Sequence, residues 1–228
     1  MNNKLIKEQY NKFHETYTKN FNQDEFSNKT FYSKIDFLDL KNKNILDIGC
    51  GDGVDLALLS NYGAHVFGID PSIKFIKKAI KNNPLGMFEQ GVGEHLPYKD
   101  KTFDLILSKW ALQTSTNIPK ILGEVARVLK KGGVFILLSK HPMIQFLQKI
   151  RDNGNGVNYY NQKIVTSNIY NNKIKLREPS HTFNEYLNPE FLKNFEIIDF
   201  QEETDFPASE QLNNNIYPTF FIVKALKK

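Results

Sequence analysis

Cysteine is nearly absent from this chain of 228 residues, in which Cys50 stands alone. One cysteine excludes an intrachain disulfide framework and a cysteine-ligated zinc cluster. The sequence also lacks a run of 18 apolar residues that would suit a membrane span, and residues 1–10 contain no apolar stretch typical of a secretory signal. We therefore expect a cytoplasmic protein that has no membrane partner.

Arginine is scarce as well, with only three among the 30 basic residues. The formal net charge is +5, but the lysines are scattered. Four of them recur at the spacing of a solvated helix face: Lys74, Lys77, Lys78 and Lys81. This pattern does not favour a nucleic-acid partner. The five histidines form no closely spaced pair of metal ligands, so the sequence predicts no metal site.

Strand and helix signals alternate through the middle of the chain. Short apolar runs predict strands over 45–48, 65–69, 86–90, 103–108 and 134–138. Helical periodicity predicts helices over 54–62, 73–81 and 118–129, the second capped by Ser72 and the third ended by Gly132 and Gly133. This alternation predicts an α/β fold with a parallel, doubly wound sheet and right-handed crossovers.

The two ends of the chain differ from the middle. Aromatic residues spaced three or four apart predict an amphipathic N-terminal helix: Tyr10, Phe13, Tyr17 and Phe21. Its aromatic face can pack against the core or contact a ligand directly. A polar segment over 151–187 predicts an insertion or lid, and the apolar runs over 196–200 and 219–225 predict two closing strands. We expect a single domain over 1–228 with a helical cap over 1–40.

A glycine-rich loop, Asp47-Ile48-Gly49-Cys50-Gly51-Asp52-Gly53, follows the first predicted strand and opens the first predicted helix. Glycines in such a loop let the backbone turn tightly and approach a ligand closely. Asp70 ends the second predicted strand about 20 residues further on, where folds of this kind bind ribose hydroxyls. The sequence therefore predicts a ribose-containing ligand at this loop.

Two cofactors are candidates for that ligand, a nicotinamide dinucleotide and S-adenosylmethionine. Val54 occupies the third glycine position of the dinucleotide motif Gly-x-Gly-x-x-Gly. Asp47 and Asp52 would flank the pyrophosphate, and like charges about 4 Å apart repel by roughly 4 kcal/mol at an effective dielectric of about 20. S-adenosylmethionine instead carries an ammonium and a sulfonium, which acids attract, and a carboxylate, which loop amides and a helix N-terminus can bind. The loop therefore favours S-adenosylmethionine.

The segment from Ile45 to Ser72 resembles the first two motifs of the class I S-adenosylmethionine-dependent methyltransferases. The resemblance extends over about residues 40–142, through segments similar to the family's adenine-side loop, its fourth strand and the turn before its fifth: 91–98, 103–106 and 127–133. Shorter segments are similar to a bacterial small-molecule branch of the methyltransferase type 11 group: 111–113, 141–142, 180–182 and 202–203. The resemblance implies a Rossmann-like sheet in the order 3-2-1-4-5-7-6 with its last-numbered strand antiparallel.

The family resemblance also implies a cofactor site that surrounds the methionine end, ribose, adenine and sulfonium of S-adenosylmethionine. Its members are Asp47, Gly49, Cys50, Gly51, Gly53, Asp70, Pro71, Ile73, Gly93, Glu94, Ser108 and Lys109. The family often has an aspartate where this chain has Val92, and that aspartate accepts from the adenine amino group. In this chain the contact comes from elsewhere, such as Glu94 or a main-chain carbonyl, or is absent.

Methyl transfer from a sulfonium is an in-line displacement, and alignment of the reactants alone is worth about 7–11 kcal/mol. A general base is needed only for a nucleophile whose proton has a high pKa, and His141 and His181 are the candidates. Each can equally be a surface or turn residue. Five residues are candidate substrate contacts, with packing roles as the alternative: Tyr10, Trp110, Gln113, Tyr159 and Tyr160.

Three functions are compatible with these motifs. The first is methylation of an O, N, S or C atom of a small molecule, with 151–187 as the lid. The second is an RNA ribose or ring-nitrogen methyltransferase, although no Asn/Asp-Pro-Pro-Tyr/Phe sequence follows the fourth strand and no arginine-rich stripe is present. The third is a non-catalytic protein that binds S-adenosylmethionine. We expect the first, in a monomer or homodimer.

Overall fold

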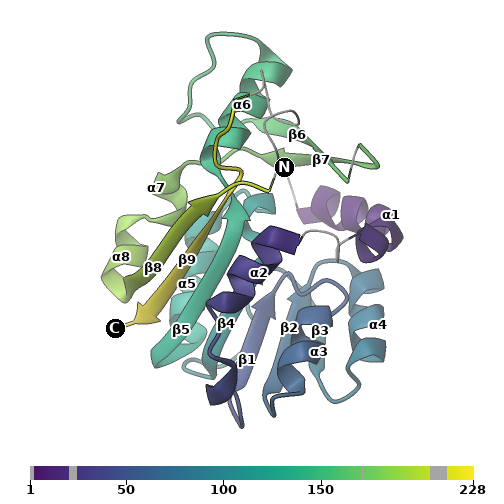
Figure 1. Ribbon diagram of the computed structural model, residues 1–228, viewed down its shortest axis with the longest axis vertical. Helices are drawn as coiled ribbons and strands as arrows, with labels where there is room; N and C mark the ends of the chain where they lie inside the picture. Colours follow the sequence, from purple (N-terminus) through teal and green to yellow (C-terminus); the bar gives the residue numbers. More distant parts are fainter. Residues whose placement is uncertain (1–2, 21–24, 171, 206–214) are drawn as a thin grey trace.

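The computed structural model describes residues 3–20, 25–170, 172–205 and 215–228, and its central feature is a seven-stranded sheet (Figure 1). The strands follow the order β3-β2-β1-β4-β5-β9-β8. Their bounds are β1 Asn44–Ile48, β2 His65–Asp70, β3 Met87–Gln90, β4 Phe103–Lys109, β5 Leu129–Lys140, β8 Phe195–Glu203 and β9 Phe220–Lys227. Strands β1 to β5 pair in parallel, and β9 runs antiparallel to both β5 and β8. This arrangement confirms the predicted order, with β8 and β9 as the sixth and seventh strands of the sheet.

Alternation along the strands divides the apolar core between the two faces of the sheet. In β1, Ile45 is fully buried among residues of α2 (Glu25–Ser33) and α3 (Val54–Ser60), whereas Leu46 is buried on the other face. That other face is covered by α5 (Ile118–Val128), α7 (Phe183–Tyr186) and α8 (Pro189–Asn194). Helices on both faces leave the carboxyl ends of the parallel strands as the edge where ligands bind in such sheets.

Side-chain caps determine where two of the helices begin, one at the predicted Ser72 and one at Asn117, which the sequence analysis did not identify. The Ser72 hydroxyl accepts from the Phe75 amide at 3.3 Å and starts α4 (Ile73–Asn82). The Asn117 side chain accepts from the Lys120 amide at 3.1 Å and starts α5. Each cap satisfies one of the amides that the first turn of a helix leaves unpaired.

The predicted role of Gly132 and Gly133 in ending α5 is wrong. The helix ends at Val128, and Leu129 is already extended and pairs with Phe103 of β4. Gly132 lies inside β5 with a φ of +74°, at an irregularity in the β4–β5 pairing. The glycine pair therefore belongs to a bulge in the strand and does not terminate the helix, because glycine also serves bulges that need a positive φ.

Helix α1 (Asn3–Asn20) lies against both the sheet domain and the predicted lid. On one side the rings of Tyr10 and Tyr17 pack on Phe75 of α4, with centroids 6.4 and 6.2 Å away. On the other side Gln9 donates to the Arg177 carbonyl at 3.0 Å and accepts from the Arg177 amide at 2.8 Å. The predicted helix is confirmed over the described residues, and Phe21 lies outside them.

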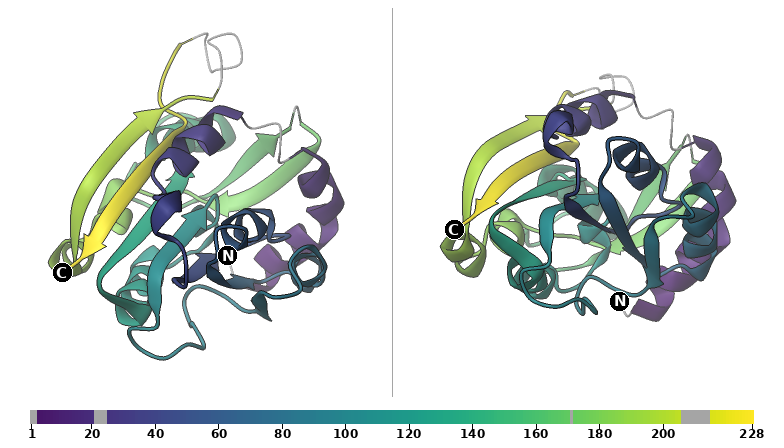
Figure 2. Two further views of the ribbon diagram at one scale, coloured as in Figure 1. Left: turned by 60° about the horizontal axis from the view of Figure 1, so that its bottom comes forward. Right: turned by 90° about the horizontal axis from the view of Figure 1, so that it is seen from below.

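The segment predicted as a lid contains a two-stranded antiparallel sheet, β6 (Ile164–Ile169) and β7 (Ile174–Pro179). Its first three residues, 151–153, belong to α6 (Pro142–Asn153), which leads into it from β5. Figure 2 shows this pair of strands (light green) beside α1 (purple). Across the part of the chain that the structure describes, no helix is both long and apolar enough to cross a membrane.

Candidate cofactor pocket

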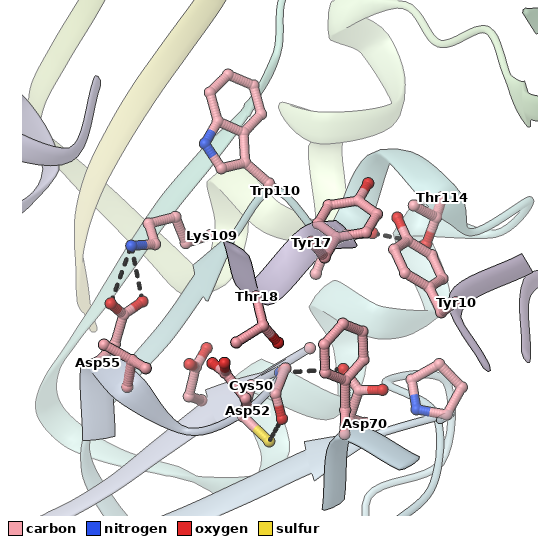
Figure 3. A pocket seen from close by; sticks show the side chains of 17 residues that line it. Tyr10, Tyr17, Thr18, Cys50, Asp52, Asp55, Asp70, Lys109, Trp110 and Thr114 are labelled. Atoms are coloured by element: carbon pink, nitrogen blue, oxygen red, sulfur yellow. Dashed lines mark hydrogen bonds and ion pairs between the residues drawn. The ribbon is translucent and has the colours of Figure 1, made fainter. Parts of the chain in front are cut away.

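A pocket with an empty volume of about 760 Å³ lies at the carboxyl ends of β1, β2 and β4 (Figure 3). It combines the glycine-rich loop after β1 with the end of β2, the segment after β4 and the aromatic face of α1. The residues that line it are Tyr10, Tyr17, Thr18, Asp47, Gly49, Cys50, Gly51, Asp52, Val54, Asp55, Asp70, Pro71, Phe75, Lys109, Trp110, Ala111 and Thr114.

The backbone amides of the glycine-rich loop donate to acceptors of the protein itself. Gly49 and Cys50 donate to the Ile69 carbonyl at 2.8 and 3.1 Å, and Gly53 donates to the Cys50 carbonyl at 2.9 Å. Gly51 donates to a carboxylate oxygen of Asp70 at 3.1 Å. The amides of Gly49, Cys50 and Gly51 hold the loop against β2, and that of Gly53 closes a turn within the loop, so these four amides are not available to the carboxylate of a ligand in this structure.

Gly49 and Gly51 meet different surroundings although both have a positive φ, of +83° and +52°. A Cβ added at Gly49 would lie 2.2 Å from the Cβ of Ala111, so the segment after β4 presses directly on the loop. A Cβ added at Gly51 would meet nothing within 4 Å. The loop is thus closed at Gly49 and open at Gly51, which itself lines the pocket.

Asp47 and Asp70 are buried carboxylates in the pocket wall, 3% and 7% exposed. Asp70 accepts from the amides of Ser72 at 2.8 Å and Gly51 at 3.1 Å. Burial raises the pKa of Asp70 to about 7, against the lowering effect of these two donors. Burial, and next the charge of Asp55, also raise the pKa of Asp47, and one of its carboxylate oxygens has no hydrogen-bond partner among the described residues.

Lys109, at the end of β4, is held by residues of α2 and α3. Its ammonium lies 2.8 Å from the Asp55 carboxylate and donates to the Asn28 side chain at 2.9 Å, as Figure 3 shows for Asp55. Tyr32 donates to Asp55 and lies 3.3 Å from the Lys109 ammonium. The positive charge of Lys109 is therefore compensated by Asp55, which leaves the carboxylates of the pocket in excess.

A second pocket, with an empty volume of about 430 Å³, adjoins the first and shares Gly49, Pro71, Ala111 and Thr114 with it. Its walls are mostly apolar. The residues found only in this pocket are Ile6, Ile48, Ile69, Gly91, Val92, Gly93, Glu94, Leu112, Ser115 and Ile121. Glu94 accepts from the Ser115 hydroxyl. The two pockets thus share part of their walls, and the aspartates are concentrated in the first.

The structure brings most of the predicted cofactor residues to these two pockets. The first is lined by Asp47, Gly49, Cys50, Gly51, Asp70, Pro71 and Lys109, and the second by Gly93 and Glu94. Three predicted residues line neither of the two pockets that the described residues form. Gly53 packs against Ala79, Ile73 is 37% exposed, and the Ser108 hydroxyl donates to the Ile48 carbonyl.

Of the predicted substrate contacts, Tyr10 and Trp110 line the first pocket. The other three are absent from both walls within the described part of the chain. Gln113 is buried, with its side chain bonded to the Trp110 carbonyl and to the Ser139 hydroxyl. Tyr159 packs on Phe146, and Tyr160 is 73% exposed.

Neither of the two predicted general bases lies in a wall of the described pockets. His141 is buried and caps α6, with one ring nitrogen accepting from the Met143 amide and the other paired with Glu202. Burial lowers the pKa of His141, against the opposing effect of Glu202. His181 is also buried, and its ring contacts Glu185 and the Gln113 carbonyl. Both imidazoles thus have both nitrogens engaged by the protein.

Sequence reasoning missed Asn28, Tyr32 and Asp55, which hold Lys109. They lie 81, 77 and 54 residues away from it in the sequence, so no local spacing relates them. It also missed Phe75, whose position on the buried face of an amphipathic helix is typical of core residues. Only a signal of long-range contact could have found these four residues.

Residues 46–137 match a family described as a methyltransferase domain. An uncharacterised protein of Methanocaldococcus jannaschii is 30% identical over 205 residues, which cover 85% of this chain and 77% of that protein. The chain belongs to the class I S-adenosylmethionine-dependent methyltransferases. The resemblance seen in the sequence is thereby confirmed.

This methyltransferase is also 38% identical over 101 residues to an uncharacterised methyltransferase of Synechocystis, a match that covers 43% of this chain and 48% of that protein. It spans about half the length of this relative and of one from Bacillus subtilis. The solved structure of an S-adenosylmethionine-dependent methyltransferase from Mesorhizobium loti has the same fold, with a TM-score of 0.71 at 21% identity. That similarity covers 90% of this methyltransferase and 99% of the other chain.

Proposed function

We propose that this protein transfers the methyl group of S-adenosylmethionine to a small molecule. The observation that carries the proposal is the buried, unpaired carboxylate oxygen of Asp47 in an acidic pocket beside the open space at Gly51. An unpaired buried acceptor costs about 1–3 kcal/mol, so a ligand that donates to it binds favourably. An ammonium group is such a donor, and the excess of carboxylates favours a cation further.

The residues of both pockets fit S-adenosylmethionine better than a dinucleotide. Asp47 would accept from the ammonium of its methionine end, Asp70 from its ribose hydroxyls, and the apolar second pocket would hold the adenine. A pyrophosphate needs a cluster of available amides. The amides of Gly49, Cys50, Gly51 and Gly53 are already engaged by acceptors of the protein itself. When bound, S-adenosylmethionine supplies a methyl group on a sulfonium, a leaving group that needs no protonation.

The chain's own contribution to this chemistry is to align the acceptor and to exclude water. Tyr10 and Tyr17 of α1, 5.4 Å apart between ring centroids, and Trp110 after β4 form an aromatic wall of the pocket. Burial raises the pKa of both tyrosines, so their hydroxyls remain neutral donors and acceptors. Because His141 and His181 are engaged away from the described pocket walls, we propose a substrate whose nucleophile needs no histidine base.

Two further observations support a small-molecule substrate. The first pocket is a concave site in which aromatic and aliphatic side chains surround a few carboxylates and one lysine, as is typical of small-molecule sites. Relatives named demethylmenaquinone methyltransferase, from Symbiobacterium thermophilum, and fatty-acid O-methyltransferase, from Mycolicibacterium smegmatis, match 46% and 51% of the chain. These matches support the reaction class and leave the substrate of this protein open.

Transfer of a labelled methyl group tests the proposal. The purified protein is incubated with S-adenosylmethionine carrying a tritiated methyl, in parallel with a protein-free metabolite extract and with total RNA. We expect label to enter the metabolite fraction with the native protein, and to enter it more slowly with the Asp70→Asn variant when S-adenosylmethionine is not saturating. Label in the RNA would support an RNA methyltransferase instead. Binding of S-adenosylmethionine with no transfer to either fraction would support a non-catalytic binding protein.

A further inference from the structure

Trp110 adopts an unusual backbone conformation in the wall of the first pocket. Its φ of +57° lies in the left-handed region, which bulky residues rarely adopt unless their surroundings impose it. The Trp110 amide donates to the Leu138 carbonyl at 2.9 Å, and its carbonyl accepts from the Gln113 side chain at 2.8 Å. The next residue, Ala111, presses on Gly49. The conformation of Trp110 therefore affects both the aromatic wall and the glycine-rich loop.

Gln113 is the residue through which the surrounding protein holds this turn. It is buried, 4% exposed, and its side-chain oxygen accepts from the Ser139 hydroxyl at 3.1 Å. That hydroxyl also lies 2.9 Å from the Tyr186 hydroxyl. The amide of Gln113 has one orientation in this network, because the Trp110 carbonyl can only accept and therefore faces the amide nitrogen.

His181 connects the same turn to the lid. It follows β7 directly after Ser180, and its side chain is fully buried. One ring nitrogen lies 3.1 Å from the Gln113 main-chain carbonyl, and the other lies 3.1 Å from the Glu185 carboxylate. The His181 amide donates to the Gln145 side chain at 3.0 Å. Because a carbonyl can only accept, the ring nitrogen that faces Gln113 must carry a hydrogen.

We propose that His181 and Gln113 are positioning residues that hold Trp110 in the pocket wall and tie its conformation to the lid strand β7. His181 binds the main chain of Gln113, and the side chain of Gln113 binds the main chain of Trp110. The consequence for methyl transfer rests on the proposed function. The link between His181, Gln113 and Trp110 does not depend on that function, because every contact in it joins residues of the chain itself.

Trp110 is the only tryptophan of the protein, so its fluorescence reports this link in the absence of any cofactor. The indole nitrogen of Trp110 is buried, and the centroid of its ring lies 6.1 Å from the ring centroid of Phe220. We expect His181→Asn and Gln113→Met to shift the emission to longer wavelength and to raise quenching by acrylamide. The amide nitrogen of a glutamine side chain reaches the position of the His181 ring nitrogen that faces the Gln113 carbonyl, so His181→Gln should keep the native emission. The exposed His65 supplies the matched control, His65→Gln.

Native emission and quenching in both His181→Asn and Gln113→Met would overturn the proposal, as would an equal change in His181→Gln and His181→Asn. Circular dichroism identifies a variant that does not fold. If either Gln113→Met or His181→Asn fails to fold, the emission and quenching of the other one test the proposal. If both fail to fold, failure of His181→Gln to recover native emission overturns the proposal. A native protein that does not bind S-adenosylmethionine would refute the proposed function and leave this test unaffected.

Discussion

Alanine in place of Gly49 is expected to lower the free energy of unfolding by about 2–5 kcal/mol and to abolish binding of S-adenosylhomocysteine. The left-handed φ of +83° costs an L-residue about 1–2 kcal/mol, and overpacking adds about 1–3 kcal/mol. The added Cβ would lie 2.2 Å from the Cβ of Ala111, so the loop and the segment after β4 must separate. Urea unfolding and calorimetric titration measure the two effects.

Gly51→Ala is the matched control, because it has the same sign of φ but open space around the added Cβ. We expect it to lose only about 1–2 kcal/mol of stability. It should still bind S-adenosylhomocysteine more weakly, because its methyl group enters the pocket. Equal stability of Gly49→Ala and the native protein would contradict the close packing of Ala111 on the loop. Native affinity in Gly51→Ala would place the ligand elsewhere.

Asp70→Asn is expected to weaken binding of S-adenosylhomocysteine by about 1.5–3 kcal/mol, or roughly 10- to 150-fold, at pH 8. The variant removes a charged acceptor that would bind the ribose, and it cannot accept from both the Ser72 and Gly51 amides as Asp70 does. Calorimetric titration measures the loss. Glu89→Gln, at an exposed carboxylate on the neighbouring strand β3, is the control and should bind as the native protein does.

The difference between Asp70→Asn and the native protein should narrow at acidic pH. The pKa of Asp70 is raised to about 7, so its carboxylate is ionised at pH 8 and mostly protonated at pH 6. Native affinity therefore falls as the pH passes downward through 7, whereas the asparagine variant has no proton to gain. A ratio of affinities that stays constant between pH 6 and pH 8 would show that the charge of Asp70 does not contribute to binding.

Local sequence patterns were sufficient for the strands of the main sheet, the starts of α3, α4 and α5, and the acidic loop. The hydroxyl of Ser72 and the side chain of Asn117 act within one helical turn, and strands such as β1 are short apolar runs, so neighbouring residues determine these features. The glycine-rich loop was equally local. Gly132 was misinterpreted because a glycine can end a helix or form a bulge, and only pairing with β4 decides between them.

The features that the sequence could not supply depend on contacts between distant segments. The sequence placed His181 in a polar segment, but its bond to Gln113 joins residues 68 apart and comes from packing of the residues after β7 on the turn after β4. The engagement of the Gly49 and Cys50 amides was also hidden, because their acceptor, the Ile69 carbonyl, belongs to the next strand. Composition and spacing identified the chemical character of the pocket. Packing determined which of its groups are available to a ligand.

Binding selectivity between S-adenosylhomocysteine and NADH tests the central claim most directly. The native protein is titrated with each compound by calorimetry at pH 8, where Asp70, whose pKa is about 7, is ionised. We expect micromolar binding of S-adenosylhomocysteine and no measurable binding of NADH. The pocket offers an unpaired carboxylate oxygen to an ammonium group, and its loop amides are already engaged and cannot bind a pyrophosphate. Tighter binding of NADH, or no binding of S-adenosylhomocysteine, would contradict this account of the pocket.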